Sequence, residues 1–341
     1  MIFVGIDFGH GETTISRIPG VSGELISQIA ISNSSSDKKV TSAVCKKDGK
    51  WALLTSNDDY RTADLREGFK APIHKMSPRD RESMKEFAKL IFDTILGSGL
   101  HYNKETNQKD FILGIACPSG WEEKYPNSQQ EYLDFFREEC ELPVDLCIKE
   151  SEAAFFSKYG LAEYSSSDTV FVIDLGSSTI DFTTFSESKC HKDFCWGREL
   201  GAHKIDDALL NIISNAHREN IKEVNLLREK YGHKDCSACL SLFVREAKER
   251  FYATAPVDSV TYHRTEPTGS FQMAIRYEHM GPWDGNPWDN CIQFSTSNEE
   301  YNHIISNYKI SIKEEFILAK NRLTNATFEL LPVFSNYEQR C

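Results

Sequence analysis

Two short segments of this chain, far apart in the sequence, carry an aspartate, glycines and hydroxyl side chains in the same order. The first is Phe3-Val4-Gly5-Ile6-Asp7-Phe8-Gly9-His10-Gly11-Glu12-Thr13-Thr14, and the second is Val170-Phe171-Val172-Ile173-Asp174-Leu175-Gly176-Ser177-Ser178-Thr179-Ile180-Asp181. Each combines a hydrophobic strand that ends at Asp with a glycine turn and a second β-prone run. Such a turn exposes backbone N–H groups to a phosphate, because glycine allows close approach and unusual φ angles. The two segments therefore predict two phosphate-binding hairpins.

The two aspartates and the turns after them form the predicted chemical centre. Asp7 and Asp174 are expected to face each other across a cleft and to hold a hydrated Mg²⁺, an ion that keeps several of its waters. Phosphoryl transfer to water depends mainly on positioning and on neutralising charge. The predicted phosphate contacts are Gly9, Gly11, Thr13, Thr14, Gly176, Ser177, Ser178 and Thr179. Two such loops at half-chain spacing predict a duplicated fold that clamps a nucleotide between its halves.

Strands and helices must alternate around these loops to position them. Besides the loop segments, β-prone runs predict strands at 25–31, 51–54, 111–116 and 144–148. Helical spacing of apolar residues predicts a helix over Arg79–Leu96, with Ser77 as its N-cap and Pro78 at its first position. Further helices are predicted at 129–141, 152–158, 204–214, 241–253 and 312–323, and a hairpin at 257–263 and 270–277. This alternation predicts an α/β layered fold.

These segments resemble the superfamily of actin, DnaK-type heat-shock chaperones, ParM-like plasmid-segregation proteins and sugar kinases. The loop from Asp7 to Thr14 looks like its first phosphate motif, and the loop from Asp174 to Asp181 looks like its second, in the chaperone form. The run 150–160 is similar to the connecting helix, and 200–209 resembles the segment that opens the helices of the second domain. The resemblance implies an actin-like ATPase fold in which two duplicated ribonuclease-H-like domains, residues 1–150 and 151–341, surround a nucleotide cleft.

The resemblance also implies roles for single residues outside the two loops. Glu150 and Asp181 stand where the family has acids that orient the attacking water, so Asp7, Glu150, Asp174 and Asp181 are the candidate catalytic residues. Glu152 is an open alternative to Glu150, because the segment has one residue more than the chaperone pattern. Lys70 is expected to contact the γ-phosphate, although a solvated surface lysine is an open alternative. Lys248 lies in a segment that resembles the helix beside the adenine, and Gly201 lies in the segment that opens the second domain.

Two departures from the family pattern stand out. His10-Gly11-Glu12 lengthens the first loop and adds an acid where a phosphate should bind, so Glu12 is expected to turn outward or to help hold the metal. The family also has a late Gly-Gly turn under the adenosine, whereas no glycine follows Gly285 here. The C-terminal part of the fold is therefore expected to be incomplete or remodelled.

Composition limits the partners. The chain has 341 residues, with 39 Lys and Arg against 51 Asp and Glu, a net charge of −12 that disfavours broad binding to nucleic acid or to anionic membranes. No apolar run approaches the ~20 residues of a transmembrane helix. The ten cysteines are scattered, which is typical of a reducing cytoplasm, and Cys236-Ser237-Ala238-Cys239 is a weak metal or redox signal.

The functional expectation is therefore a DnaK-like, ATP-binding and Mg²⁺-dependent protein whose slow ATP hydrolysis is coupled to domain closure, with ATP and ADP as ligands. The likeness to DnaK covers only the ATPase portion, so a protein client or self-association stays open. Two alternatives on the same fold are a ParM-like filament protein controlled by nucleotide and a small-molecule kinase. Fold resemblance alone does not separate them.

Overall fold

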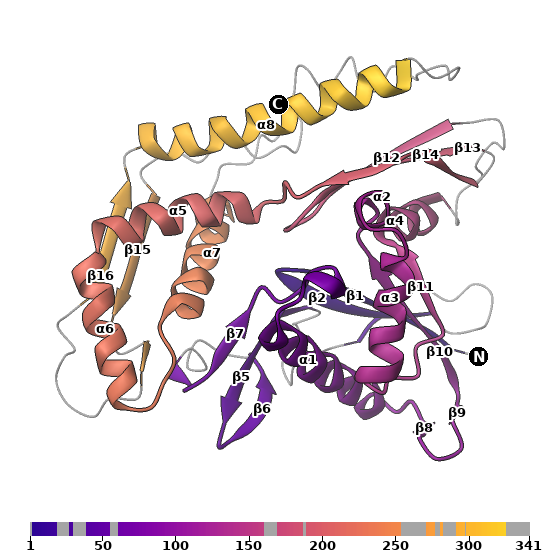
Figure 1. Cartoon of the computed structure of the whole chain (residues 1–341), viewed down its shortest axis with the longest axis horizontal. Coiled ribbons are helices and arrows are strands. Elements are labelled where there is room, and N and C mark those ends of the chain that lie inside the picture. Colours follow the sequence, from indigo (N-terminus) through magenta and orange to yellow (C-terminus); the bar gives the residue numbers. More distant parts are fainter. Residues whose placement is uncertain are drawn as a thin grey trace.

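The structure is a computed structural model that describes residues 2–18, 27–29, 39–54, 61–159, 169–186, 189–253, 271–276, 280–281, 291–296 and 298–324. Its strands and helices form two groups, which follow one another along the chain (Figure 1). Helix α4 (Glu150–Tyr159) leads from the last strand of the first group toward the first strand of the second. The predicted α/β fold is confirmed.

The first half is built on one mixed sheet in the order β11-β10-β1-β2-β3, with β4 also paired to β2. Strands β1 and β2 form an antiparallel hairpin, and β10 lies parallel to β1. The strands are β1 (Ile2–Phe8), β2 (Glu12–Ile18), β3 (Ser27–Gln28), β4 (Lys39–Thr41), β10 (Phe111–Cys117) and β11 (Leu146–Lys149). The strands expected at 111–116 and 144–148 are thus confirmed, the second in shortened form.

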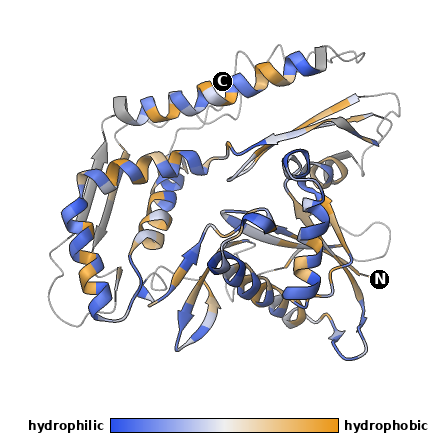
Figure 2. Ribbon diagram, viewed as in Figure 1, coloured by the Kyte–Doolittle hydropathy of each residue, from blue (hydrophilic) through white to orange (hydrophobic). Residues whose placement is uncertain are grey.

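Helix α1 (Pro78–Gly97) covers this sheet and begins as the sequence predicts. The Ser77 side chain accepts a hydrogen bond from Asp80 N, and Pro78 opens the first turn. Met84, Phe87 and Ile91 are buried in the core, whereas the opposite side of the helix is largely hydrophilic (Figure 2). The other helical segments of this half are η2 (Ile73–Lys75), α2 (Gly120–Lys124), α3 (Ser128–Asp134) and the π-helical turn η3 (Phe135–Glu139). The last two confirm the helix expected at 129–141.

The first half also carries a small sheet in the order β6-β5-β7 and a separate hairpin of β8 and β9. These two elements lie at different ends of the first half (Figure 1). These strands are β5 (Ala43–Lys47), β6 (Lys50–Leu53), β7 (Leu65–Glu67), β8 (Tyr102–Asn103) and β9 (Gln108–Lys109). Ala43, Cys45 and Leu65 of the small sheet share an apolar cluster with Leu209 and Phe243 of the second half. The two halves are therefore joined by a buried apolar contact as well as by the chain.

The second half repeats the antiparallel meander of the first in a sheet ordered β12-β13-β14. In both hairpins the aspartate holds the same place: Asp7 pairs with Thr14, and Asp174 pairs with Asp181. The strands are β12 (Thr169–Leu175), β13 (Ile180–Ser186), β14 (Lys189–Arg198), β15 (Phe271–Arg276) and β16 (Cys291–Thr296). The helices are α5 (His203–Ala216), α6 (Arg218–Lys230), α7 (Ser237–Ala253) and α8 (Asn298–Thr324).

Three elements of the second half, α6, β14 and β16, were not predicted from the sequence. Helix α6 is mostly polar, and only Val224 and Arg228 are buried, so it has too few apolar positions to show a period. Strand β14 contains several charged residues and a bulge, which break the alternation of a regular strand. The strand expected at 270–277 is confirmed and pairs with β16, whereas the strand expected at 257–263 lies outside the described residues.

Candidate functional site

The two glycine loops border one cavity of about 620 Å³. The first loop joins β1 to β2 at residues 9–11, and the second joins β12 to β13 at residues 176–179. The loops nearly touch, since a Cβ built on Gly11 would lie 3.2 Å from Ser177 Oγ. A cavity of this size is typical of small-molecule sites. Segments from both halves of the chain thus meet in a single site.

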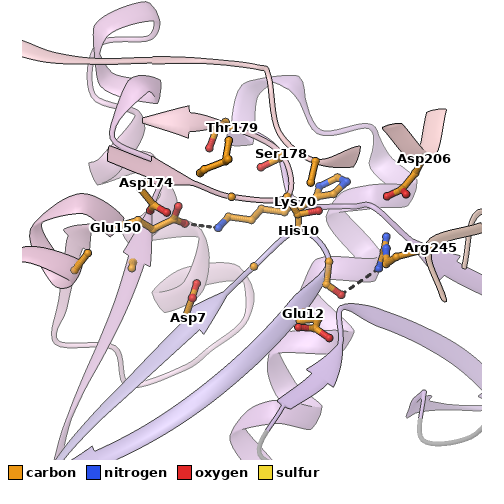
Figure 3. A pocket seen from close by; sticks show the side chains of 18 of the residues that line it. Asp7, His10, Glu12, Lys70, Glu150, Asp174, Ser178, Thr179, Asp206 and Arg245 are labelled. Atoms are coloured by element: carbon orange, nitrogen blue, oxygen red, sulfur yellow. Dashed lines mark hydrogen bonds and ion pairs between the residues drawn. The ribbon is translucent and has the colours of Figure 1, made fainter. Parts of the chain in front are cut away.

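Most of the residues predicted to bind or act on a nucleotide line this cavity, and Figure 3 shows several of them. They are Asp7, Gly9, Gly11, Lys70, Glu150, Asp174, Gly176, Ser177, Ser178, Thr179 and Lys248. The sequence motifs therefore located one contiguous site, although they span both halves of the chain.

The two threonines predicted in the first loop do not line the cavity. Thr13 is fully buried, and its Oγ1 lies 2.9 Å from Ser42 Oγ. Thr14 is half-buried in β2, where it pairs with Asp7. Because β2 begins at Glu12, both threonines belong to the strand and not to the loop.

Asp181 and Gly201 also lie outside the cavity lining and support the second loop from behind. Asp181 is 1% exposed: its Oδ2 accepts a hydrogen bond from Thr179 Oγ1 at 2.7 Å, and its Oδ1 accepts one from Gly120 N at 2.5 Å. Gly201 packs so closely under the loop that a Cβ there would lie 2.2 Å from Ser177 O. Glycine is required at 201 for this close approach.

The acidic side of the cavity is organised around one buried cation. Lys70 Nζ lies 2.5 Å from Glu150 Oε1, and their side chains are 4% and 17% exposed. Asp7 and Asp174 extend toward the same space from the two strands that precede the loops (Figure 3). Lys70 is therefore a buried site residue, and the alternative of a solvated surface lysine is wrong.

Burial and mutual repulsion act on these carboxyl groups. Burial, followed by the charge of Asp7, raises the pKa of Asp174. Burial also raises the pKa of Glu150, and the nearby Lys70 opposes that rise. The site thus concentrates more negative charge than one lysine compensates, which is the environment of a cation site.

The second loop is held by the start of helix α5. The backbone N–H groups of Gly201, Ala202 and His203 donate to the carbonyl groups of residues 178, 176 and 177, respectively, at 2.9–3.1 Å. Gly176 N donates to Thr179 O at 2.9 Å, which closes the turn. The carbonyl groups of the loop are therefore hydrogen-bonded within the protein.

The first loop carries two residues whose roles the sequence left open. Glu12 forms an ion pair with Lys39, 2.6 Å between Oε1 and Nζ, so its charge is compensated although it borders the cavity. His10 also lines the cavity, and burial, His203 and Arg245 lower its pKa to about 4. His10 is consequently neutral near pH 7. The expected charge problem at Glu12 is resolved by pairing.

Basic residues of helix α7 close the opposite side of the cavity. Arg245 Nη1 donates to Gly11 O at 3.2 Å, and its Nη2 lies 3.0 Å from Glu67 Oε2 of β7. Lys248, one turn further on, pairs with Asp206 at 2.7 Å. Arg245 and Asp206 line the cavity but were not predicted as site residues. Arg245 could have been found from its spacing, because residues three apart on a helix lie on the same face and Lys248 was already a predicted site residue.

Within the described residues, no group of three or more His, Cys, Asp or Glu side chains is placed to hold a metal ion directly. No described helix is long and apolar enough to cross a membrane. The bounded cleft, the duplicated meander and the paired acidic loops define the class of fold to which the chain belongs.

That class is the actin-like ATPase fold. The structure is similar to the crystal structure of MreB5 of Spiroplasma citri bound to ADP, with a TM-score of 0.54 and 16% sequence identity. The match covers 94% of this chain and 78% of the MreB5 chain. No protein-family model and no curated protein sequence matches the chain. At this level of identity the likeness shows the fold, and function must be argued from the site.

Proposed function

We propose that this chain is an actin-like ATP-binding protein, closest to a DnaK-type ATPase domain, that hydrolyses ATP slowly with Mg²⁺ and couples hydrolysis to closure of its two halves. The proposed domains are residues 1–150 and 151–341. One observation carries the proposal: both acidic glycine loops border the same cavity and approach each other at Gly11 and Ser177. A ligand with several phosphates fits such a site, because glycine-rich turns admit phosphate to the backbone.

The residues have distinct proposed roles. The loops at 9–11 and 176–179 cradle the phosphates, and Ser177, Ser178 and Thr179 add hydroxyl groups. Lys70 supplies the buried positive charge beside them. Glu150 orients the attacking water, whereas Asp181 acts through Thr179, to which it is hydrogen-bonded. Lys248, which lines the cavity, is the proposed contact on the nucleoside side of the ligand.

Asp7 and Asp174 are the proposed partners of hydrated Mg²⁺. They fit this ion because they come from both halves, line the cavity and repel each other, which contributes to the raised pKa of Asp174. Mg²⁺ would neutralise phosphate charge during transfer. The two aspartates would hold it through its waters.

A coupling between ligand and closure follows from where the ligand groups lie. Arg245 joins α7 to the first loop and to β7, so it connects the two halves of the chain beside the cavity. A nucleotide that touches both loops binds the closed state better than an open one.

Self-association is the second candidate function, and α8 gives one observation in its favour. Ile310, Ile317 and Leu318 are 46–55% exposed on this helix. Large apolar side chains gathered on one exposed helix suit contact with another protein. A filament or oligomer would appear as light scattering that depends on nucleotide, in the samples used for the binding experiment.

The proposal is tested by calorimetry on the full chain with ATP, ADP and adenosine, each with and without Mg²⁺, together with phosphate release from ATP. We expect ATP and ADP to bind, Mg²⁺ to strengthen ATP binding, and adenosine to bind much more weakly. Equal binding of ATP and adenosine would show that the loops do not hold phosphates. ATP binding without phosphate release would support the proposed nucleotide site but contradict the proposed hydrolysis.

A further inference from the structure

A bulge in β14 brings two cysteines together on one face of the sheet. Thr183 of β13 pairs with Cys195, and Phe185, two residues on, pairs with Cys190, with a register shift between the two positions. Positions two apart on a strand face the same side. The five residues from Cys190 to Cys195 therefore span a single same-face step of the ladder, so the two cysteines lie next to each other on that face.

Cys195 lies in a polar environment although it is buried. Lys149 Nζ is 3.9 Å from Cys195 Sγ, and Thr183 Oγ1 is 3.4 Å from it. Lys149 is 8% exposed and also pairs with Glu122 at 3.0 Å. A buried ammonium beside a thiol favours the thiolate, which is the nucleophilic form.

A line of hydroxyl groups leads to the same sulfur. Ser119 Oγ lies 2.5 Å from Ser151 Oγ, which lies 2.6 Å from Thr183 Oγ1. Ser151 belongs to the first turn of α4, so the positive end of that helix is near this line. Hydroxyl groups in series can all donate in one direction, and a thiolate at the end is the acceptor that completes the series.

The hydrogen bond from Cys190, with Thr183 and Lys149, lowers the pKa of Cys195 against the effect of burial. Cys236 and Cys239 at the start of α7 differ from Cys195, because burial raises the pKa of both thiols. Cys190 is only partly buried, so a small reagent reaches the pair from its side. Neither cysteine lines the nucleotide cavity.

We propose that Cys190 and Cys195 form a peroxide-reactive dithiol, in which Cys195 attacks and Cys190 resolves. The Cys195 thiolate attacks one oxygen of a hydroperoxide, so that an S–O bond forms and the O–O bond breaks. The peroxide is reduced to an alcohol, or to water if it is hydrogen peroxide. The Cys190 sulfur then attacks Cys195, an S–S bond forms, and the sulfenic oxygen leaves as water. Two thiols lose two electrons, and the peroxide gains them.

The disulfide would lie close to a tight contact between the halves. Gly197, two residues after Cys195, packs against Gly120, and a Cβ at Gly197 would come 2.7 Å from Gly120 Cα and 2.3 Å from Asp181 Oδ1. A bridge between Cys190 and Cys195 would fix the bulge that precedes this contact. The oxidised and reduced forms are therefore expected to differ in the mobility of β14.

The experiment treats the full reduced chain with hydrogen peroxide, blocks the remaining thiols and identifies disulfides by peptide mass spectrometry. We expect a Cys190–Cys195 bridge to form first, while Cys236 and Cys239 stay reduced as internal controls. Cys195→Ser should abolish the reaction at this site. Cys190→Ser should stop at a sulfenic acid on Cys195 that dimedone traps.

Lys149 provides a matched pair of variants. Lys149→Gln should slow formation of the bridge ~10-fold at pH 5, below the pKa of about 6 that Cys195 has in the folded chain, since there a shift of one pKa unit changes the thiolate fraction about tenfold. Lys149→Arg keeps the charge and should stay within ~3-fold of the unsubstituted chain. Equal rates in all three chains, or oxidation of Cys236 and Cys239 at the same rate, would overturn the proposal. Isotope-coded alkylation of the unsubstituted chain ranks the thiols even if a variant fails to fold, and Cys195 must then rank first.

Discussion

Lys70 Nζ lies 2.5 Å from Glu150 Oε1, although the two residues are 80 positions apart in the sequence. Lys70 follows β7, and Glu150 is the first residue of α4, so the pair joins two separate elements at the floor of the cavity. Both Asp7 and Asp174 also act on this pair electrostatically. The site therefore depends on one buried cation held among acids.

Loss of that cation should destabilise the fold. Lys70→Met leaves Glu150 buried with two neighbouring carboxylates, and we expect a loss of ~3 kcal/mol or more in the free energy of unfolding. Adding Glu150→Gln to the same chain should restore most of it. Lys75→Met is the control, since the exposed Lys75–Glu199 pair at 3.7 Å should be worth less than ~1 kcal/mol. Urea unfolding measures all four chains. Equal stability of the single and double variants would contradict the prediction.

Removal of one proposed Mg²⁺ partner should act on hydrolysis and leave the fold intact. Asp174→Asn keeps the shape of the side chain, and we expect Mg²⁺-dependent ATP hydrolysis to fall ~10²-fold or more. Asp93→Asn, on the exposed side of α1, is the matched control and should change nothing. Phosphate release across a Mg²⁺ titration gives the comparison. Unchanged turnover in Asp174→Asn would remove Asp174 from the site.

The second loop offers a substitution that fills the phosphate space without a clash inside the protein. A Cβ at Gly176 meets only Thr179 O, at an ordinary 3.5 Å, so Gly176→Val should fold and should block phosphate approach. The expected result is weaker ATP binding with adenosine binding unchanged. Gly5→Val is the control, because a Cβ at Gly5 has nothing within 4 Å and Gly5 does not line the cavity. Normal ATP affinity of Gly176→Val in calorimetry would place the phosphates elsewhere.

Asp181 should make stability depend on pH. Burial raises its pKa from the ordinary 3.8 to about 7. Between these two pKa values the folded state keeps a proton on Asp181 that the unfolded chain releases. The protonated carboxyl therefore contributes its full stabilisation below about pH 4. The free energy of unfolding falls by at most ~4 kcal/mol as the pH rises from there to about 7. Asp181→Asn should be flatter over this range and relatively more stable at pH 8. The free energies of unfolding of both chains, measured at pH 5 and at pH 8, test this prediction. Parallel pH profiles of the two chains would rule out a raised pKa.

Arg245 should control how long a nucleotide stays bound. Arg245→Met removes the contacts from α7 to Gly11 O and to Glu67, and loss of one charged hydrogen bond should speed ADP release ~10-fold. Arg250→Met, on the same helix but 75% exposed at its side chain, is the control. Displacement of a fluorescent ADP by unlabelled ADP measures the release rate. If both variants release ADP as the unsubstituted chain does, Arg245 does not hold the halves together.

The local parts of the site could be predicted from the sequence. Asp7 with Gly9 and Gly11, and Asp174 with Gly176, were found because a strand, its terminal acid and its turn lie within twelve residues and are encoded by neighbours. The start of α1 at Ser77 and Pro78 was predictable for the same reason, since capping involves only the first turn.

The tertiary structure alone decided which of these side chains reach the cavity. Thr13 and Asp181 share the motifs but turn into the protein, where they bond Ser42, Thr179 and Gly120. Arg245 reaches Gly11 from 234 residues away. Such contacts depend on how the two halves pack against each other, and packing is a property of the whole apolar core and not of any short stretch of sequence.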